Sequence, residues 1–308
     1  MNNILNNVEN EVKSPKIGTK KITIIGSGFV GKSAGKGFLS LGHEVTFVDI
    51  NEMLIESLND VGLKACNIGA ECAHDRDIYM VSVLTPTIND HVDFRFIDSA
   101  VISLGQSLKN SAGHPLIVIR STVPPGTTEK RFVPLIEKYS GKKLGDGFSV
   151  AMNPEFLREV SAEEDFMHPW IVVIGSSDPG SAQLLGELYQ PFNAPIVHMN
   201  IKEAEMMKYV HNIFNATKIS FFNEMRMVAE KIGVDADKIF ATVIKSAEGS
   251  WNHEYGIRDF GPFDGSCLPK DSRAFLSWSN EELKTKMPLL HALIRVNENL
   301  KDKKYLEY

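Results

Sequence analysis

The chain has 308 residues, of which 43% are hydrophobic, so it can bury one large core or two ordinary ones. Its formal net charge is −6 and it contains no lysine- and arginine-rich run, which disfavours nucleic acid and anionic membranes as partners. Three cysteines (Cys66, Cys72 and Cys267) in no metal-ligand spacing indicate a reducing cytoplasm, with neither a disulfide scaffold nor a metal site. No signal-like segment opens the chain and no apolar run approaches a membrane span, so we expect an untargeted, cytoplasmic protein.

Residues 1–20 are polar and rich in asparagine and lysine, which predicts a flexible tail. The β-branched run Ile22–Ile25 then leads directly into a glycine-rich loop, after which apolar residues recur at helical spacing as far as Leu41. This pattern predicts a strand, a tight turn and a helix whose N-terminus binds the pyrophosphate of a dinucleotide. The candidate cofactor-binding residues of the loop are Gly26, Gly28, Phe29, Val30 and Gly31.

Asp49 closes a second predicted strand, Glu44–Val48, and stands 18 residues after Gly31. A carboxylate at this position can accept hydrogen bonds from the ribose diol of the cofactor. The sequence therefore predicts NAD, rather than NADP, as the cofactor.

Further strand-like runs at residues 78–84, 116–120, 149–152 and 171–174 alternate with helical patterns. Together they predict an α/β fold with a Rossmann-like, doubly wound parallel sheet covered by helices on both faces. Two of these runs end in polar clusters, 85–87 and 121–126, at the strand ends where ligands bind in such sheets. Thr85, Thr87 and Thr122 are therefore candidate cofactor contacts, with ordinary turn chemistry as the alternative.

Pro154 follows the strand at 149–152 and is typical of a helix start. A helix there would place Glu155 and Glu159 on one face. In an enclosed site, two adjacent carboxylates leave one protonated near neutral pH, which provides a general acid or base; on a solvated face they are ordinary surface residues.

A long helical pattern runs from Ile201 to about Ile232, with Gly233 as its stop signal. Lys208 and Asn212 are four residues apart and share a face, where they can supply a cation and an amide to a developing oxyanion; an exposed lysine is the alternative. We expect an NAD-binding domain at 21–200 and, at 201–308, an all-helical domain that forms a homodimer through this helix.

The loop 261–271 presents Cys267 immediately before another helix start. Helix N–H groups and the charge of Lys270 favour an anion there, so we expect Cys267 to act as a thiolate nucleophile. The alternative is that Cys267 is a small buried hydrophobic residue.

These motifs occur in a specific order: the glycine loop, Thr85-Pro86-Thr87, Ser121-Thr122-Val123-Pro124, residues 153–159, Lys208 with Asn212, and Gly265–Asp271. In this order the chain resembles the UDP-glucose/GDP-mannose dehydrogenase family over roughly residues 21 to 300. The resemblance implies oxidation of the C6 alcohol of a nucleotide sugar to a carboxylate, with two NAD⁺ as hydride acceptors and a thioester on the cysteine. It also implies residue roles: Cys267 as the nucleophile, Lys208 and Asn212 as oxyanion stabilisers, and Thr122, Glu155, Glu159 and Asp271 as the residues that handle water and protons. Lys270 is a further candidate cofactor contact.

The sequence departs from the family pattern at several places. It stops within the helix that leads, in the family, into a C-terminal UDP- or GDP-binding domain, so we expect this chain to lack that domain. The stretch between Gly62 and Asp77 is shorter than usual. Asp264 and Val160 stand where the family has glycine, and the Asp264 carboxylate can either oppose thiolate formation or recognise an amine or hydroxyl of an unusual substrate.

Two other functions remain open from the sequence. A two-electron hydroxyacid-type dehydrogenase has the same layout of domains, and a non-catalytic NAD-binding subunit would need a partner chain. The presence of Cys267 and both glutamates favours the alcohol-to-acid enzyme, because oxidation of a secondary alcohol needs no thiol.

Overall fold

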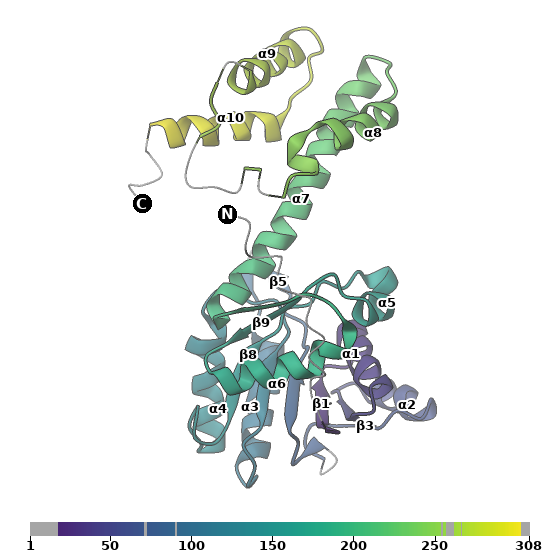
Figure 1. The fold of residues 1–308 in the computed structure, drawn as a ribbon, viewed down its shortest axis with the longest axis vertical. Coiled ribbons are helices and arrows are strands. Elements are labelled where there is room, and N and C mark those ends of the chain that lie inside the picture. The colour runs from purple at the N-terminus through teal and green to yellow at the C-terminus, as the bar shows by residue number, and fades with distance from the viewer. Residues whose placement is uncertain are drawn as a thin grey trace, which may run out of the picture. The chain divides into compact units, whose positions relative to one another are not determined.

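The computed structural model describes residues 18–70, 73–89, 91–253, 255–256, 262–265 and 267–302. The chain divides into two compact units, residues 1–210 and 211–308, and each is described by itself (Figure 1). The division falls within one helix, α7 (Ile201–Lys231). Most of the predicted tail, residues 1–17, lies outside the described residues. Among the described helices, none is long and apolar enough to cross a membrane.

An eight-stranded sheet forms the centre of the first unit, with the strand order β10-β9-β8-β7-β4-β1-β2-β3 (Figure 1). From β1 the chain proceeds to β2 and β3 on one side and then returns to β4 on the other side. Such a reversal creates the crevice where ligands bind in open α/β sheets. The strands are β1 (Lys21–Ile25), β2 (Glu44–Val48), β3 (Ala65–Cys66), β4 (Ile78–Val81), β7 (Leu116–Ile119), β8 (Ser149–Met152), β9 (Val172–Ser176) and β10 (Ile196–Met199), and a separate hairpin joins β5 (Thr87–Ile88) to β6 (His91–Val92).

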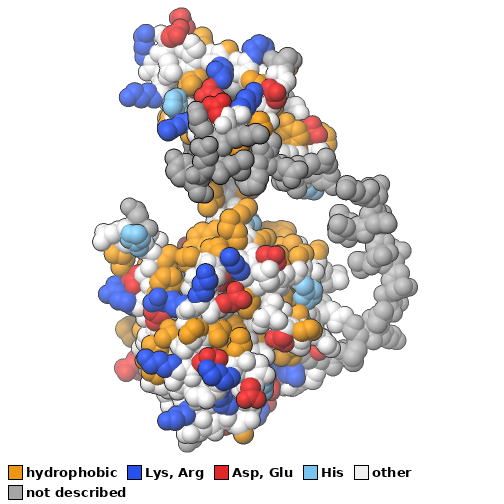
Figure 2. All heavy atoms as spheres, turned by 90° about the vertical axis from the view of Figure 1, so that its left-hand side faces the viewer, with side chains coloured by type: hydrophobic (Ala, Val, Ile, Leu, Met, Phe, Trp, Pro, Cys, Tyr) orange, Lys and Arg blue, Asp and Glu red, His pale blue; other side chains and the backbone are white. Residues whose placement is uncertain are grey.

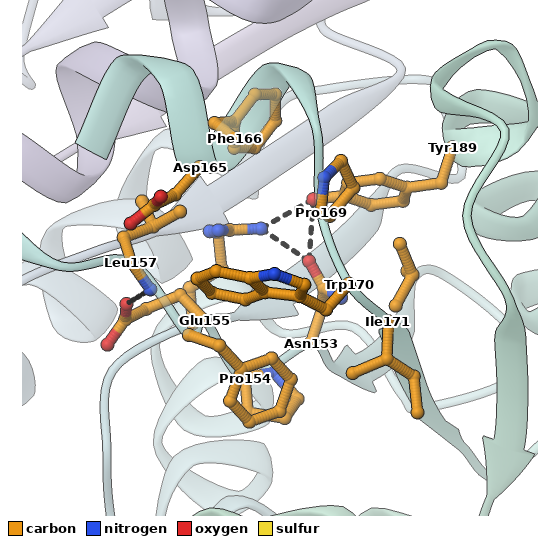
Figure 3. Close-up of a pocket in the computed structure, with 13 residues that line it drawn as sticks. Asn153, Pro154, Glu155, Leu157, Asp165, Phe166, Pro169, Trp170, Ile171 and Tyr189 are labelled. Carbon is orange, nitrogen blue, oxygen red and sulfur yellow. Dashed lines mark hydrogen bonds between the residues drawn. The ribbon is translucent and has the colours of Figure 1, made fainter. Parts of the chain in front are cut away.

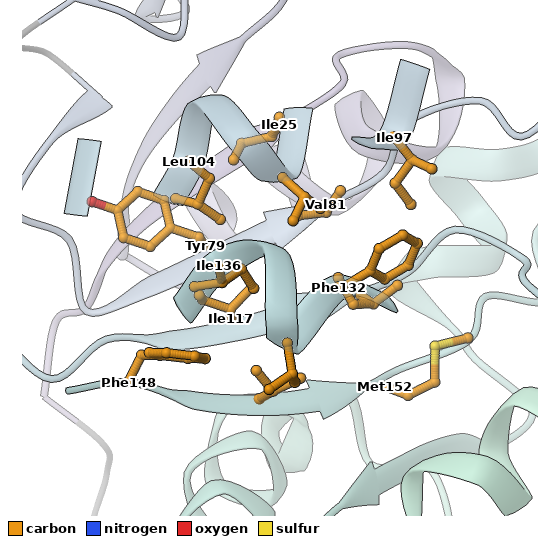
Figure 4. Close-up of a cluster of buried hydrophobic side chains, with 14 of the residues drawn as sticks. Ile25, Tyr79, Val81, Ile97, Leu104, Ile117, Phe132, Ile136, Phe148 and Met152 are labelled. Atoms are coloured by element: carbon orange, nitrogen blue, oxygen red, sulfur yellow. The ribbon is translucent and has the colours of Figure 1, made fainter. Parts of the chain in front are cut away.

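The central strands β4 and β7 are buried on both faces, which explains their continuous apolar runs. Successive residues point to opposite sides, so Ile117 and Ile119 of β7 join one hydrophobic cluster and Leu116 and Val118 join another. The first cluster, which contains Phe132, packs beneath α3 (Arg95–Leu108) and α4 (Val133–Ser140) (Figure 4). The second packs against α1 (Phe29–Ser40), α2 (Glu52–Asp60), α5 (Ala162–Met167) and α6 (Pro179–Tyr189). The predicted doubly wound architecture is confirmed.

Local sequence signals account for the helix starts. The side chain of Asn51 accepts a hydrogen bond from Leu54 N at the start of α2, and Asp178 accepts one from Ser181 N at the start of α6. Pro179 occupies the first turn of α6, where its missing N–H costs nothing. Short irregular helices occur at Thr128–Phe132, Glu159–Ser161 and Gln190–Phe192.

The sheet is mostly parallel, as predicted, but its direction changes toward one edge. β9 runs antiparallel to β8, with Met152 opposite Gly175, and β10 pairs parallel to β9. A parallel return requires a crossover that spans the length of the sheet. The only α-helix between β8 and β9 is α5, whose six residues extend about 9 Å, less than the roughly 13 Å that β8 spans. The chain therefore re-enters the sheet from the same end.

The second unit is all-helical in its described part, as predicted. It consists of the later part of α7, α8 (Ala236–Ser246), a short turn at Glu248–Ser250, α9 (Leu268–Glu281) and α10 (Pro288–Lys301). Gly233, with φ of +73°, follows the end of α7 as expected. Val228, Met287 and Leu290 form its small core, and the buried carboxylate of Glu224 in α7 accepts hydrogen bonds from Leu289 N and Leu290 N at the start of α10.

The cysteines differ from one another in state. Cys66 is disulfide-bonded, so the prediction that the chain carries no disulfide is wrong for this residue. Cysteine spacing does not reveal which side chains the fold brings together. Cys72 lies outside the described residues, and Cys267 is an exposed thiol.

Candidate functional site

The polar clusters predicted at the strand ends meet in the first unit. The hydroxyl of Thr85, after β4, donates to the carbonyl of Thr122, after β7, at 2.8 Å. Ser121 strengthens the same junction by donating to the carbonyl of Val83 at 2.6 Å. Thr87 is exposed and belongs to the hairpin strand β5. The structure thus brings Thr85 and Thr122 together and carries Thr87 onto the hairpin.

Three glycines of the loop between β1 and α1 have separate physical roles. Gly26 has φ of +91°, and a Cβ there would lie 2.6 Å from the carbonyl oxygen of Ser82. A Cβ on Gly31 would lie 2.0 Å from the carbonyl oxygen of Gly26, so this glycine lets the helix pack onto the turn. Gly28 is the N-cap of α1, where no side chain caps the helix, and its missing Cβ faces open space. Uncapped N–H groups beside open space fit the pyrophosphate of a dinucleotide.

Asp49 lies beside this loop at the end of β2. Its carboxylate accepts a hydrogen bond from Ser27 N at 2.8 Å through Oδ2, and from Ile50 N and Asn51 N through Oδ1. These bonds fix the carboxylate next to the glycine loop. This placement is the one that the predicted ribose contact requires.

The open space at Gly28 leads to a prediction about cofactor affinity. In Gly28→Ala the new methyl group contacts no protein atom, so we expect unchanged thermal stability. The same methyl would stand between the cofactor and the N-terminus of α1, so the dissociation constant for NADH should rise by about tenfold or more. Fluorescence titration with NADH measures this effect. Gly18→Ala, at another open but remote glycine, is the matched control, and unchanged affinity in Gly28→Ala would contradict the assignment.

Lys208 and Glu155 form a buried ion pair in the first unit. Nζ of Lys208 lies 3.1 Å from Oε1 of Glu155, and the two side chains are only 7% and 15% exposed. Nζ also donates to the main-chain carbonyl of Glu155, and it lies 5.2 Å from the centre of the Phe156 ring. The interpretation of Lys208 as an ordinary exposed lysine is therefore wrong. A lysine held in this way is a fixed positive charge beside a carboxylate.

The helix predicted after Pro154 does not form. Residues 153–158 are neither helix nor strand. The carbonyl of Glu155 accepts from Lys208, and its carboxylate accepts from Leu157 N at 2.7 Å. The carboxylate of Asp165 in α5 accepts hydrogen bonds from the main-chain N–H and the guanidinium of Arg158. These bonds replace the helical ones. Because of them, Glu159 is exposed at the start of a short 3-10 turn, and the prediction that Glu155 and Glu159 share a helix face is wrong.

Glu205 is a buried residue of this region that sequence reasoning missed. It is 0% exposed, and its carboxylate accepts hydrogen bonds from Gly126 N and Thr128 N. Glu205 precedes Lys208 by one helical turn in α7, while Gly126 and Thr128 follow the Thr122 loop. Burial and the charge of Glu205 raise the pKa of the neighbouring Tyr209. The only sequence signal was that Glu205 lies on the same helix face as the apolar Ile201.

In the second unit, Cys267 is the N-cap residue of α9 and is exposed. The predicted position of the thiol at a helix start is confirmed, and the interpretation as a buried hydrophobic residue is wrong. The ammonium of Lys270 lies 2.7 Å from the carboxylate of Asp271, its neighbour in the first turn of α9. Lys270 therefore contributes a positive charge that Asp271 partly compensates. Asn212 is exposed on the second-unit part of α7.

Asp264, near Cys267 in sequence, is also paired. Its carboxylate accepts from Lys301 of α10 at 2.9 Å, and this contact lowers the pKa of Asp264. Asn297, on the same helix, donates to the carbonyl of Phe263 at 3.0 Å. The negative charge of Asp264 is thus compensated, which weakens its predicted opposition to a thiolate at Cys267.

Comparison with known families identifies the chain. Residues 20–71 and 60–193 match the model of the UDP-glucose/GDP-mannose dehydrogenase family, NAD binding domain, and residues 202–299 match the central domain of the same family. The chain belongs to this family. The cofactor of the family domain is NAD, which agrees with the glycine loop and Asp49.

Relatives and solved structures support the same family. The chain is 36% identical to GDP-mannose 6-dehydrogenase from Pseudomonas putida, over 91% of this chain and 68% of that protein. It is 35% identical to UDP-glucose 6-dehydrogenase AglM from Haloferax volcanii, over 90% of this chain and 69% of the relative. A crystal structure of GDP-mannose dehydrogenase from Pseudomonas aeruginosa superimposes with a TM-score of 0.87 at 33% identity, covering 92% of this chain and 69% of the other. The chain thus belongs to the family of NAD-dependent nucleotide-sugar 6-dehydrogenases.

Proposed function

We propose that the chain oxidises the C6 alcohol of a nucleotide sugar to a carboxylate through covalent intermediates on Cys267. The observation that carries this proposal is the exposed thiol at the N-cap of α9. N–H groups at a helix start stabilise negative charge that develops on a group beside them. A two-electron dehydrogenase has no use for such a nucleophile, so the position of Cys267 favours the four-electron reaction.

The reaction has four balanced steps. The alcohol loses a hydride and a proton to become an aldehyde, and the Cys267 sulfur adds to the aldehyde carbon to form a thiohemiacetal. The thiohemiacetal loses a second hydride and a proton to become a thioester. Water then cleaves the thioester, which releases the carboxylate and restores the thiol. NAD⁺, when bound, accepts one hydride in each of the two oxidations.

Cofactor binding, oxyanion stabilisation and proton transfer are assigned to different residues of the chain. The glycine loop (Gly26, Gly28, Phe29, Val30 and Gly31), Asp49, Thr85, Thr87, Thr122 and Lys270 are proposed to bind the cofactor. Lys208 and Asn212 stabilise the oxyanions that form when sulfur or water adds to the carbon. Thr122, Glu155, Glu159 and Asp271 hold water and move protons. The buried Lys208–Glu155 pair supports these assignments most directly, and exposed Glu159 supports them least.

The substrate class follows from the relatives, which are named for GDP-mannose and UDP-glucose. We therefore propose a hexose linked to a nucleoside diphosphate as the substrate. The test is to measure NADH formed per mole of product, with mass identification of the product, for GDP-mannose, UDP-glucose, free sugars and simple hydroxyacids. Two NADH per carboxylate are expected from a nucleotide sugar, whereas one NADH, or turnover of hydroxyacids alone, would reject the proposal.

We also propose that residues 201–308 form a homodimer through α7, as the sequence predicts, and that the protein is cytoplasmic. Ile213, Phe214 and Ile219 of α7 are each at least 60% exposed, and hydrophobic side chains reach the surface of this helix (Figure 2). Exposed apolar surface of this kind is typical of an interface. Light scattering at micromolar concentration tests the dimer, and a monomeric mass would reject it.

A further inference from the structure

Arg120 is buried in the first unit with neutral partners. It is 4% exposed, and its Nη1 donates to Oδ1 of Asn153 and to the hydroxyl of Tyr189 (Figure 3). Within the described part of the chain, the hydrogen bonds of this guanidinium go to Asn153 and Tyr189 rather than to a carboxylate, and its buried Nε has no hydrogen-bond partner. Burying a cation without a counter-ion is costly, so an apolar side chain would be the more stable choice at this position. A role other than stability accounts better for an arginine here.

The three polar side chains form a closed network. The Tyr189 hydroxyl donates to Oδ1 of Asn153 at 2.6 Å, while Nδ2 of Asn153 donates to the carbonyl of Val173 in β9 at 2.8 Å. The Asn153 amide therefore fits in only one orientation. Burial raises the pKa of Tyr189, which keeps its hydroxyl protonated and able to donate. The network also lines a small cavity with Glu155 at its edge (Figure 3).

The location of the network connects it to the proposed site. Arg120 directly follows β7 and Asn153 directly follows β8, one residue beyond the paired residues Ile119 and Met152. Their main chains remain bonded to the sheet, because Arg120 N donates to the carbonyl of Val81 and Asn153 N donates to that of Ile119. Thr122 stands two residues after Arg120, and Glu155 stands two residues after Asn153. The network thus joins the two loops at the points where they leave the sheet.

We propose that Arg120, Asn153 and Tyr189 are positioning residues that hold Thr122 and Glu155 in place for the hydrolysis of the Cys267 thioester. This inference rests on the proposed function, because it assigns the network to one step of that reaction. The three side chains act through the two loops. A network with a merely structural role would, when weakened, lower stability and slow all steps alike.

The test is Tyr189→Phe, which removes one hydroxyl and leaves the ring in place. Asn153 then loses a hydrogen-bond donor and Arg120 loses an acceptor. The loops that carry Thr122 and Glu155 are therefore held less firmly where they leave the sheet. We expect kcat to fall by about 10- to 100-fold, because small displacements of catalytic groups cost that much. The slowed hydrolysis should leave an acyl adduct on Cys267, which intact mass spectrometry of acid-quenched enzyme detects during turnover.

Tyr139→Phe is the matched control, because the half-buried Tyr139 forms no hydroxyl hydrogen bond within the described part of the chain. Arg120→Lys is a second variant, which keeps the charge but cannot bridge both acceptors. Adducts in both variants and none in the control would support the network's role. Wild-type kinetics, or a uniform slowing with no adduct in either variant, would overturn it. If the wild-type enzyme makes no carboxylate, the proposed function itself fails and this inference falls with it.

Discussion

Cys267→Ala is expected to abolish carboxylate formation while leaving NADH affinity unchanged. Without the thiol no thiohemiacetal forms, so the aldehyde cannot pass its second hydride and no thioester follows. The rate of acid formation should fall by roughly 10³-fold or more, as is usual when a covalent nucleophile is removed. Mass identification of the product, together with NADH yield, measures the loss. Because Cys267 is exposed, its replacement leaves no cavity in the core.

The control for this variant is Ser277→Ala, another exposed position of α9, which should behave as wild type. An alanine variant that accumulates one equivalent of NADH and an aldehyde would support the assignment in detail. Carboxylate production at the wild-type rate would show that the sulfur takes no part in the reaction.

Lys208→Met is expected to lower both activity and stability. The substitution leaves the Glu155 carboxylate buried without its cation, which should cost about 3–5 kcal/mol of unfolding free energy. It also removes the proposed oxyanion stabiliser, so kcat should fall by about 10²- to 10³-fold. Urea unfolding and steady-state kinetics measure the two effects. Lys202→Met, at an exposed lysine of the same helix, is the matched control.

The double variant Lys208→Met, Glu155→Met separates the two effects. Removing both partners restores part of the stability, because no unpaired charge remains buried. Activity should stay low, since the ammonium is still missing. Wild-type kcat in the single variant would exclude Lys208 from catalysis.

Much of the first unit could be predicted from local sequence. Strands β1, β2, β4, β7 and β8 are runs of apolar and β-branched residues, and the glycine loop marks the turn into α1. By contrast, β3 has only two residues, and β10 has the exposed Val197 and His198 at its centre, so neither shows a strand pattern. The direction of β9 depends on the length of the preceding α5 rather than on its own residues.

Contacts within the candidate site were predictable where its residues follow strand ends, as the bond between Thr85 and Thr122 illustrates. It was not predictable where contacts join distant segments. Lys208 donates to the carbonyl of Glu155 across 53 residues of sequence, in a segment that is not the helix that Pro154 suggested. From the sequence, Arg120 is simply the polar end of a strand and Glu205 an ordinary helix glutamate. Their burial could not be predicted, because tertiary packing decides whether a charged residue is buried.

The first turns of α7 are integral to the NAD-binding unit. Glu205 supplies the acceptor for Gly126 N and Thr128 N, and Lys208 supplies the only cation that pairs with Glu155 among the described residues. A fragment that ended after β10 would therefore leave Gly126 N and Thr128 N without this acceptor and the Glu155 carboxylate without its cation. A chimera that combines this NAD-binding unit with the helical unit of a relative would have to be joined beyond Val210. The start of α7 would then come from the same protein as the sheet.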